Sequence, residues 1–204
     1  GFEEKVRKFV EDGGIFIATY WSGIVDDTDK CFLGGVPHGL MDVLGIRSTE
    51  IDGLYDWEEN SLVPVEGNAL GMEKTYSCKY LCDLVEIRGA GTVMTYGSDF
   101  YAGYPALTVN TYGKGKAWYV AADAEQGFQE DFLKKIVKES GISCGIKEDI
   151  PEGLEVTSRD RKGAFLYLPE LGKRGSKSSP PGGRGGSSLW REYGKASAIW
   201  NCCY

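Results

Sequence analysis

The start of the chain alternates between a helical and an extended hydrophobic pattern. Apolar side chains recur at helical spacing between charged residues at Phe2, Val6, Phe9 and Val10. This spacing predicts an amphipathic helix, and Gly13-Gly14 supplies its end because glycine adopts the left-handed conformation at low cost. Residues 15–20 then read Ile-Phe-Ile-Ala-Thr-Tyr, a short apolar run typical of a strand buried on both faces in a parallel sheet. Helix, glycine turn and buried strand together predict one step of an α/β fold.

The same pattern continues through the next hundred residues. It predicts a short helix at 39–44 closed by Gly45, an edge strand at 48–54, strands at 76–88 and 92–96 with a turn at 89–91 between them, a hairpin of 106–112 and 116–121, and an amphipathic helix at 127–140. Mixed helices and strands of this kind indicate a layered α/β structure.

The character of the chain changes towards its end. Residues 150–156 and 163–168 look like the first strands of a separate β module, whereas Gly, Ser, Pro and Arg dominate from Leu168 to Ser188 without an apolar period. We therefore expect an α/β domain at 1–147, the start of a β domain at 148–168, and a frameshifted or disordered tail at 169–204.

Composition narrows the possible partners. The 204 residues are 42% hydrophobic and 26% charged, with a net charge of -7, which argues against a nucleic-acid or acidic-membrane partner. No apolar run approaches the roughly 20 residues that span a bilayer. The six cysteines match no zinc or thioredoxin spacing, so we expect idle thiols in a reducing cytoplasm and neither metal nor cofactor.

Three stretches carry a family resemblance. Residues 9–27 contain Val-Glu-Asp-Gly-Gly and Thr-Tyr-Trp-Ser-Gly-Ile-Val-Asp-Asp, residues 33–47 read Leu-Gly-Gly-Val-Pro-His-Gly-Leu-Met-Asp-Val-Leu-Gly-Ile-Arg, and residues 112–120 read Tyr-Gly-Lys-Gly-Lys-Ala-Trp-Tyr-Val. In this order they resemble the family 42 glycoside hydrolases, which are β-galactosidases. His38 stands where that family usually has Gly, and Asp27 where it commonly has Glu.

The resemblance implies a fold and an assembly role. It implies the second domain of such an enzyme, a three-layer domain akin to flavodoxin and class I glutamine amidotransferases, lacking its first strand at the N-terminus and followed by a partial β module. In the family this domain forms a homotrimer, and a preceding (β/α)8 barrel carries two catalytic glutamates for retaining hydrolysis of terminal β-D-galactosides. The barrel is not part of this sequence, so we expect the chain alone to be inactive. The tail departs from the family, but a shift of one base near residue 188 permits its usual Pro-Tyr-Gly ending.

Five residues are candidates for an interface or for facing a sugar: Tyr20, Trp21, Asp26, Asp27 and His38. The alternative for the aspartates is a solvated loop, for the aromatic residues packing in a core, and for His38 a surface loop position. No residue is expected to be catalytic or to bind metal or cofactor.

Two other functions remain open. One is a stand-alone module for carbohydrate binding or assembly. The other is an amidotransferase-like hydrolase, which needs a cysteine on a strand-to-helix elbow and a histidine partner. We also expect the isolated chain to be prone to association, because an uncovered strand edge and apolar face promote it.

Overall fold

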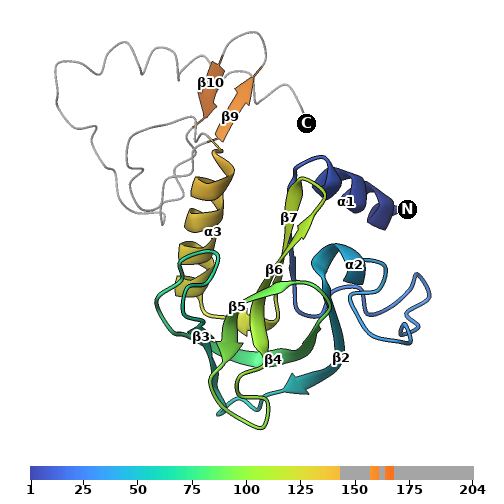
Figure 1. Cartoon of the computed structure of the whole chain (residues 1–204), viewed down its shortest axis with the longest axis vertical. Helices are drawn as coiled ribbons and strands as arrows, with labels where there is room; N and C mark the ends of the chain where they lie inside the picture. The colour runs from blue at the N-terminus through green and yellow to red at the C-terminus, as the bar shows by residue number, and fades with distance from the viewer. Residues whose placement is uncertain (143–156, 161–163, 168–204) are drawn as a thin grey trace, which may run out of the picture. The chain divides into compact units, whose positions relative to one another are not determined.

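The computed structural model describes residues 1–142, 157–160 and 164–167 (Figure 1). The chain divides after Ile142 into two parts, which are described separately.

The first part is built on an eight-stranded sheet with the order β1-β7-β6-β5-β3-β4-β2 and with β8 paired to β4. Its strands are β1 (Ile15–Thr19), β2 (Ile46–Gly53), β3 (Asn60–Pro64), β4 (Tyr76–Ile87), β5 (Gly91–Tyr96), β6 (Pro105–Tyr112), β7 (Gly115–Val120) and β8 (Ala122–Ala124). The mixed α/β class expected from the sequence is confirmed.

The parallel arrangement is more limited than expected. β1 pairs in parallel with β7, while every other pairing in the described sheet is antiparallel. The two-residue connection between β6 and β7 allows only the antiparallel arrangement of that pair. The prediction that residues 15–20 form a strand buried on both faces is wrong, since β1 ends the sheet order and only Ala18 of it is buried.

Three helices accompany the sheet. They are α1 (Phe2–Glu11), α2 (Met41–Leu44) and α3 (Gln126–Ser140), each close to its predicted range. Gly45 and Gly141 end α2 and α3 at φ of 64° and 65°, as their sequence positions predict.

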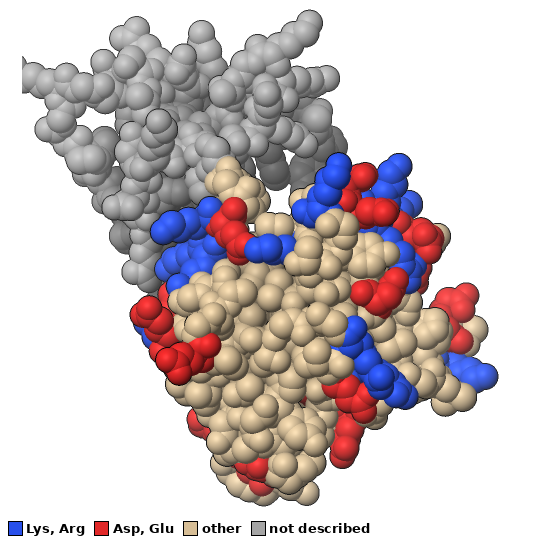
Figure 2. Space-filling model, viewed as in Figure 1, with Lys and Arg blue, Asp and Glu red and all other residues tan. Residues whose placement is uncertain are grey.

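One part of the core lies where α3 meets the sheet, and another includes the buried valines of α1 and Val43 and Leu44 of α2. The fully buried Trp118 ring of β7 packs edge-on against Phe132, with ring centroids 5.6 Å apart, and Phe132 in turn stacks on Phe128 at 5.5 Å. These aromatic pairs add directional contacts to the apolar area that the helix buries. On the face shown in Figure 2, Lys, Arg, Asp and Glu gather near the edges and leave a broad central area with few charges.

Strand neighbours differ from the predicted order in one place. The predicted hairpin of 106–112 and 116–121 is confirmed as β6 and β7, with Tyr112 opposite Gly115. In contrast, β4 and β5 do not pair as the two arms of a turn, because β3 lies between them. The sequence pattern missed both β3 and the three-residue β8.

The second part contributes β9 (Thr157–Asp160) and β10 (Ala164–Tyr167), which pair antiparallel. The strand predicted at 163–168 is confirmed as β10. The strand predicted at 150–156 and the tail at 169–204 lie outside the described residues. No helix in the described ranges is long and apolar enough to cross a membrane.

Candidate association surface

The segment between β1 and α2, residues 20–39, contains all five candidate residues, and we call it the 20–39 loop. Positive φ angles occur at Trp21 (60°) and Asp29 (61°), and at the glycines Gly23, Gly34, Gly35 and Gly39. A positive φ angle at a non-glycine residue destabilises the fold by about 1–3 kcal/mol, so it persists only where the surrounding structure enforces it. The loop therefore has a defined shape, and its contacts show how it is held.

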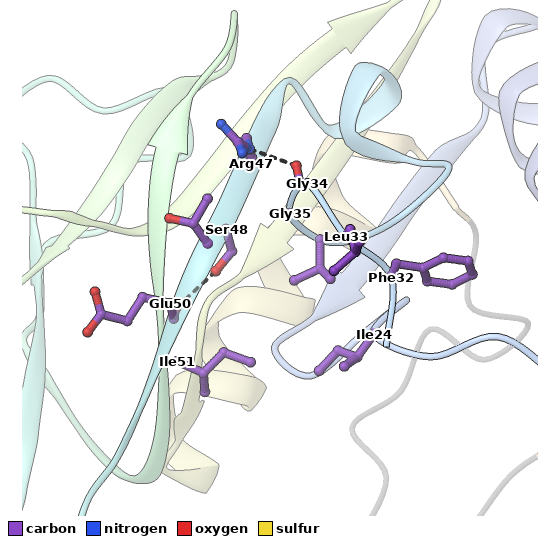
Figure 3. A pocket seen from close by; sticks show the side chains of 11 residues that line it. Ile24, Phe32, Leu33, Gly34, Gly35, Arg47, Ser48, Glu50 and Ile51 are labelled. Atoms are coloured by element: carbon purple, nitrogen blue, oxygen red, sulfur yellow. Dashed lines mark hydrogen bonds between the residues drawn. The ribbon is translucent and has the colours of Figure 1, made fainter. Parts of the chain in front are cut away.

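The first anchor ties the loop to β2 (Figure 3). Val36 and Ser48 exchange backbone hydrogen bonds of 2.9 and 2.8 Å, and Arg47 Nε donates to the Gly34 carbonyl at 2.8 Å. A Cβ added at Gly35 would lie 2.7 Å from the Arg47 side chain. Glycine at this position allows the loop to approach the strand closely.

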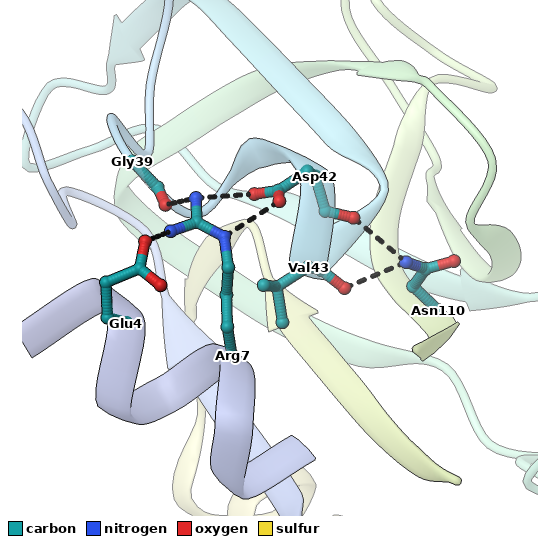
Figure 4. A network of polar contacts seen from close by, with 6 residues as sticks. All are labelled: Glu4, Arg7, Gly39, Asp42, Val43 and Asn110. Atoms are coloured by element: carbon teal, nitrogen blue, oxygen red, sulfur yellow. Dashed lines mark hydrogen bonds and ion pairs between the residues drawn. The ribbon is translucent and has the colours of Figure 1, made fainter. Parts of the chain in front are cut away.

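The second anchor ties the far end of the loop to α1 (Figure 4). Arg7 Nη2 donates to the Gly39 carbonyl at 2.5 Å, while its Nε and Nη2 donate to both carboxylate oxygens of Asp42 at 2.9 and 3.0 Å. Arg7 also pairs with Glu4 at 2.7 Å. The hydrogen bonds from Arg7 hold the pKa of Asp42 below its usual value. Asn110 Nδ2 donates to the Val43 carbonyl at 2.8 Å and so fixes the end of α2.

Asp26 shapes the loop from within. Its Oδ1 accepts hydrogen bonds from the Thr28 hydroxyl at 2.7 Å, the Thr28 N–H at 2.8 Å and the Lys30 N–H at 3.1 Å. These bonds lower the pKa of Asp26, those from Thr28 most. This carboxylate makes an Asx turn, as short polar side chains often do.

Apolar side chains point out of this anchored loop. Leu33 is 91% exposed, Trp21 57% and Val25 43%, and we call these three residues the apolar loop surface. An open cavity of about 360 Å³ adjoins it, lined by Leu33, Ile24 and Ile51 among others (Figure 3). Large apolar side chains on a rigid loop are typical of surfaces that bind another protein.

The remaining candidates make separate contacts. The Tyr20 N–H extends the β1–β7 pairing by donating to the Val120 carbonyl at 2.7 Å. Burial raises the pKa of the Tyr20 phenol, and the negative charge of Asp123 raises it further. His38 is exposed and stacks on Phe32 with ring centroids 3.7 Å apart.

Asp27 is exposed at the tip of the loop. The structure thus brings the five candidates into one loop without joining them in one chemical centre.

A buried carboxylate lies behind the start of the loop. Asp83 of β4 is fully buried and accepts a hydrogen bond from the Tyr119 hydroxyl through Oδ2. Its Oδ1 has no hydrogen-bond partner among the described residues. Burial raises the pKa of Asp83, and the hydrogen bond from Tyr119 partly offsets this rise. Sequence reasoning missed Asp83, since nothing in a strand pattern marks an aspartate as inward-facing.

The described part of the chain contains no group of three or more His, Cys, Asp or Glu side chains arranged to hold a metal ion. The described residues thus define a mixed α/β domain that exposes apolar side chains on an anchored loop. Comparison with known proteins identifies the family of the chain. The β-galactosidase trimerisation domain family matches residues 1–143, and the chain belongs to this family.

Individual relatives agree with this assignment. The chain is 48% identical over 169 residues to the β-galactosidase BgaP of Planococcus sp. (strain L4). The matched residues make up 82% of this chain and 25% of that relative. It is 42% identical to the β-galactosidase Pbg of Clostridium perfringens, covering 82% and 24%. Among solved structures, a β-galactosidase from Rahnella sp. R3 is 46% identical with a TM-score of 0.79, covering 84% of this chain and 25% of that one. The chain therefore spans about a quarter of the length of these relatives.

Proposed function

We propose that this domain joins copies of a β-galactosidase into a homotrimer and contributes no catalytic group of its own. Other parts of the parent enzyme would cleave terminal β-D-galactosides with retention of the configuration at the anomeric carbon. This reaction would take place in the cytoplasm. The observation that carries the proposal is the match of residues 1–143 to the β-galactosidase trimerisation domain family. Leu33, 91% exposed on a loop anchored at both ends, is the residue we propose for the contact.

The physical argument is one of burial and preorganisation. Fully burying a large apolar side chain contributes about 1.5–3 kcal/mol, so the three side chains of the apolar loop surface could supply several kcal/mol of association free energy. Because the loop is already fixed by its anchors, little conformational freedom remains to be lost on binding.

The candidate residues take different parts in this proposal. Trp21 and His38 would lie in the interface or at the mouth of the parent's active site, with Asp27 as the exposed carboxylate beside them. Tyr20 and Asp26 would position them, since both make hydrogen bonds within the domain.

The finer fold assignment is part of the proposal. A flavodoxin-like, amidotransferase-like three-layer domain at 1–147 is supported by the parallel pairing of β1 with β7 and by α1 lying next to both strands. The β module at 148–168 is supported by the β9–β10 pair. A frameshifted tail at 169–204 remains a prediction that the codons of the gene would test.

The amidotransferase-like hydrolase finds no support in the described residues. Cys78 and Cys82 lie within β4 and are buried, not on a strand-to-helix elbow. Neither thiol has a histidine partner among the described residues, because His38 lies in the 20–39 loop and the thiols lie in β4. His38 is stacked on Phe32.

The test is the molar mass of the chain measured by light scattering during size exclusion. We expect trimers for the native sequence and a shift to monomers for Leu33→Asp, because the charge would have to be buried in the interface. Leu133→Asp on α3, at a leucine 49% exposed, is the matched control and should leave the trimer intact. Equal effects of both substitutions would contradict the role of the loop.

A further inference from the structure

A second open pocket, of about 500 Å³, lies where β4 pairs with β8, and we call it the β4–β8 pocket. It is lined by Tyr80 and by four charged side chains, Glu59, Lys79, Asp123 and Glu125, among others. A volume of this size accommodates a small ligand.

The backbone at Tyr80 departs from an ordinary strand. Register with β8 places Lys79 opposite Asp123 and Cys82 opposite Ala122, so Tyr80 and the next residue form a bulge. Tyr80 has φ of 62°, which is unfavourable for an aromatic residue, and its side chain is 56% exposed. Bulges and strained residues of this kind occur preferentially at functional sites, where they redirect a side chain.

A loop with two more aromatic rings begins and ends beside Tyr80. The Leu54 N–H donates to the Tyr80 carbonyl at 2.8 Å, and at the other end Asn60 pairs with Cys78. Between them, the rings of Tyr55 and Trp57 are parallel within 5° with centroids 4.9 Å apart, and they are 64% and 78% exposed.

A tight turn holds these two rings in place. The Glu58 carboxylate accepts the Tyr55 N–H at 3.0 Å, and the Glu58 N–H donates to the Tyr55 carbonyl at 2.8 Å. These two hydrogen bonds close the turn that carries the aromatic pair.

The chemistry of the pocket selects among ligands. Glu59 and Lys79 pair at 2.8 Å, which leaves the carboxylates of Asp123 and Glu125 in excess and disfavours an anionic ligand. Carboxylates accept hydrogen bonds from hydroxyl groups, and exposed aromatic faces cover apolar C–H surfaces. A pyranose ring offers both, with hydroxyls at its rim and C–H groups on its faces.

We propose that the β4–β8 pocket binds a neutral pyranoside, with Tyr80 and the neighbouring aromatic pair covering a face of the sugar. The choice of a β-galactoside as the ligand rests on the proposed function. The site would hold substrate or a substrate-like glycan at the surface of this domain.

The test is a ¹⁵N–¹H NMR titration of the full chain with methyl β-D-galactopyranoside. We expect chemical-shift changes at the Trp57 indole N–H and at the amides of Lys79 and Tyr80, with a dissociation constant in the millimolar range. Tyr80→Asn should weaken binding at least tenfold without lowering the melting temperature, because Asn tolerates positive φ. Tyr104→Asn, at a tyrosine 49% exposed outside the pocket, is the matched control and should bind normally.

Three results would overturn the proposal: no shift changes with the galactoside, equal weakening by both tyrosine substitutions, or shift changes at the same amides with tetramethylammonium but not with sugar. The last would identify a cation site, since aromatic faces and carboxylates also bind quaternary ammonium groups. A chain that binds sugar but remains monomeric would refute trimer formation while leaving the pocket assignment intact.

Discussion

Arg7 connects α1 to both α2 and the 20–39 loop, so its removal should loosen the candidate association surface as well as the fold. Arg7→Met keeps most of the alkyl stem and removes the hydrogen bonds to Asp42, the Gly39 carbonyl and Glu4. The side chains of Arg7 and Asp42 are 25% and 51% exposed, so solvent weakens their attraction, and an exposed pair contributes only about 0.2–1 kcal/mol. The part-buried charged bond to the carbonyl adds about 1.5 kcal/mol.

Together these contacts predict a loss of about 2 kcal/mol in the free energy of unfolding. For a domain of this size the loss corresponds to a melting temperature lower by roughly 4–8 °C. Urea unfolding followed by circular dichroism measures it, and Lys5→Met, at an exposed residue of the same helix, is the matched control with an expected change near zero.

A double-mutant cycle with Asp42→Asn isolates the pair itself. We expect a coupling energy of about 0.5–1 kcal/mol at neutral pH. Because the folded-state pKa of Asp42 is depressed, this contribution is present above the unfolded pKa of about 4 and is lost as pH falls through the folded pKa. A coupling energy near zero at neutral pH, or one that persists in strong acid, would refute the reasoning.

Three further predictions concern the loop, the buried carboxylate and the thiols. Gly35→Ala should destabilise the domain by about 1–3 kcal/mol, and by more than Gly34→Ala. Both glycines have positive φ, but only a Cβ at Gly35 would collide with a neighbouring side chain. Urea unfolding of the two variants measures the difference. Since burial raises the folded-state pKa of Asp83, the native chain should lose stability relative to Asp83→Asn as pH rises above the ordinary carboxylate pKa of about 4, and a pH-independent difference would contradict this. Iodoacetamide should label Cys31 within minutes and spare Cys78 in the folded chain, as peptide mass spectrometry would show, because only the former is exposed.

Periodic segments were the parts of the fold that could be predicted from sequence. The helices at 2–11 and 126–140 and the β6–β7 hairpin follow from apolar spacing and flanking glycines, because each buries a continuous face over more than one turn or a full strand. β3 and β8 escaped detection since a five-residue segment ending at Pro64 and a three-residue segment adjoining β7 offer too little pattern. Strand order could not be predicted either, because the pairing of β3 between β4 and β5 joins segments distant in sequence.

The sequence predicted where the candidate site lies, but not the contacts that hold it or the exposure of its side chains. The loop was found through the residues that carry the family resemblance, and its paired glycines marked a constrained backbone. Its anchors, Arg7 and Arg47, lie outside it in sequence, and nothing in their local patterns indicates which carbonyl each would bind. The exposure of Leu33 was equally hidden, since hydrophobic residues in a loop more often contact the core than the solvent.

Sedimentation velocity of the native chain over a range of concentrations tests the central claim most directly. We expect a species with three times the chain mass of 22.4 kDa that becomes dominant as concentration rises. A sharp monomer boundary at every concentration, together with a cooperative unfolding transition of that monomer, would contradict an assembly role for this domain.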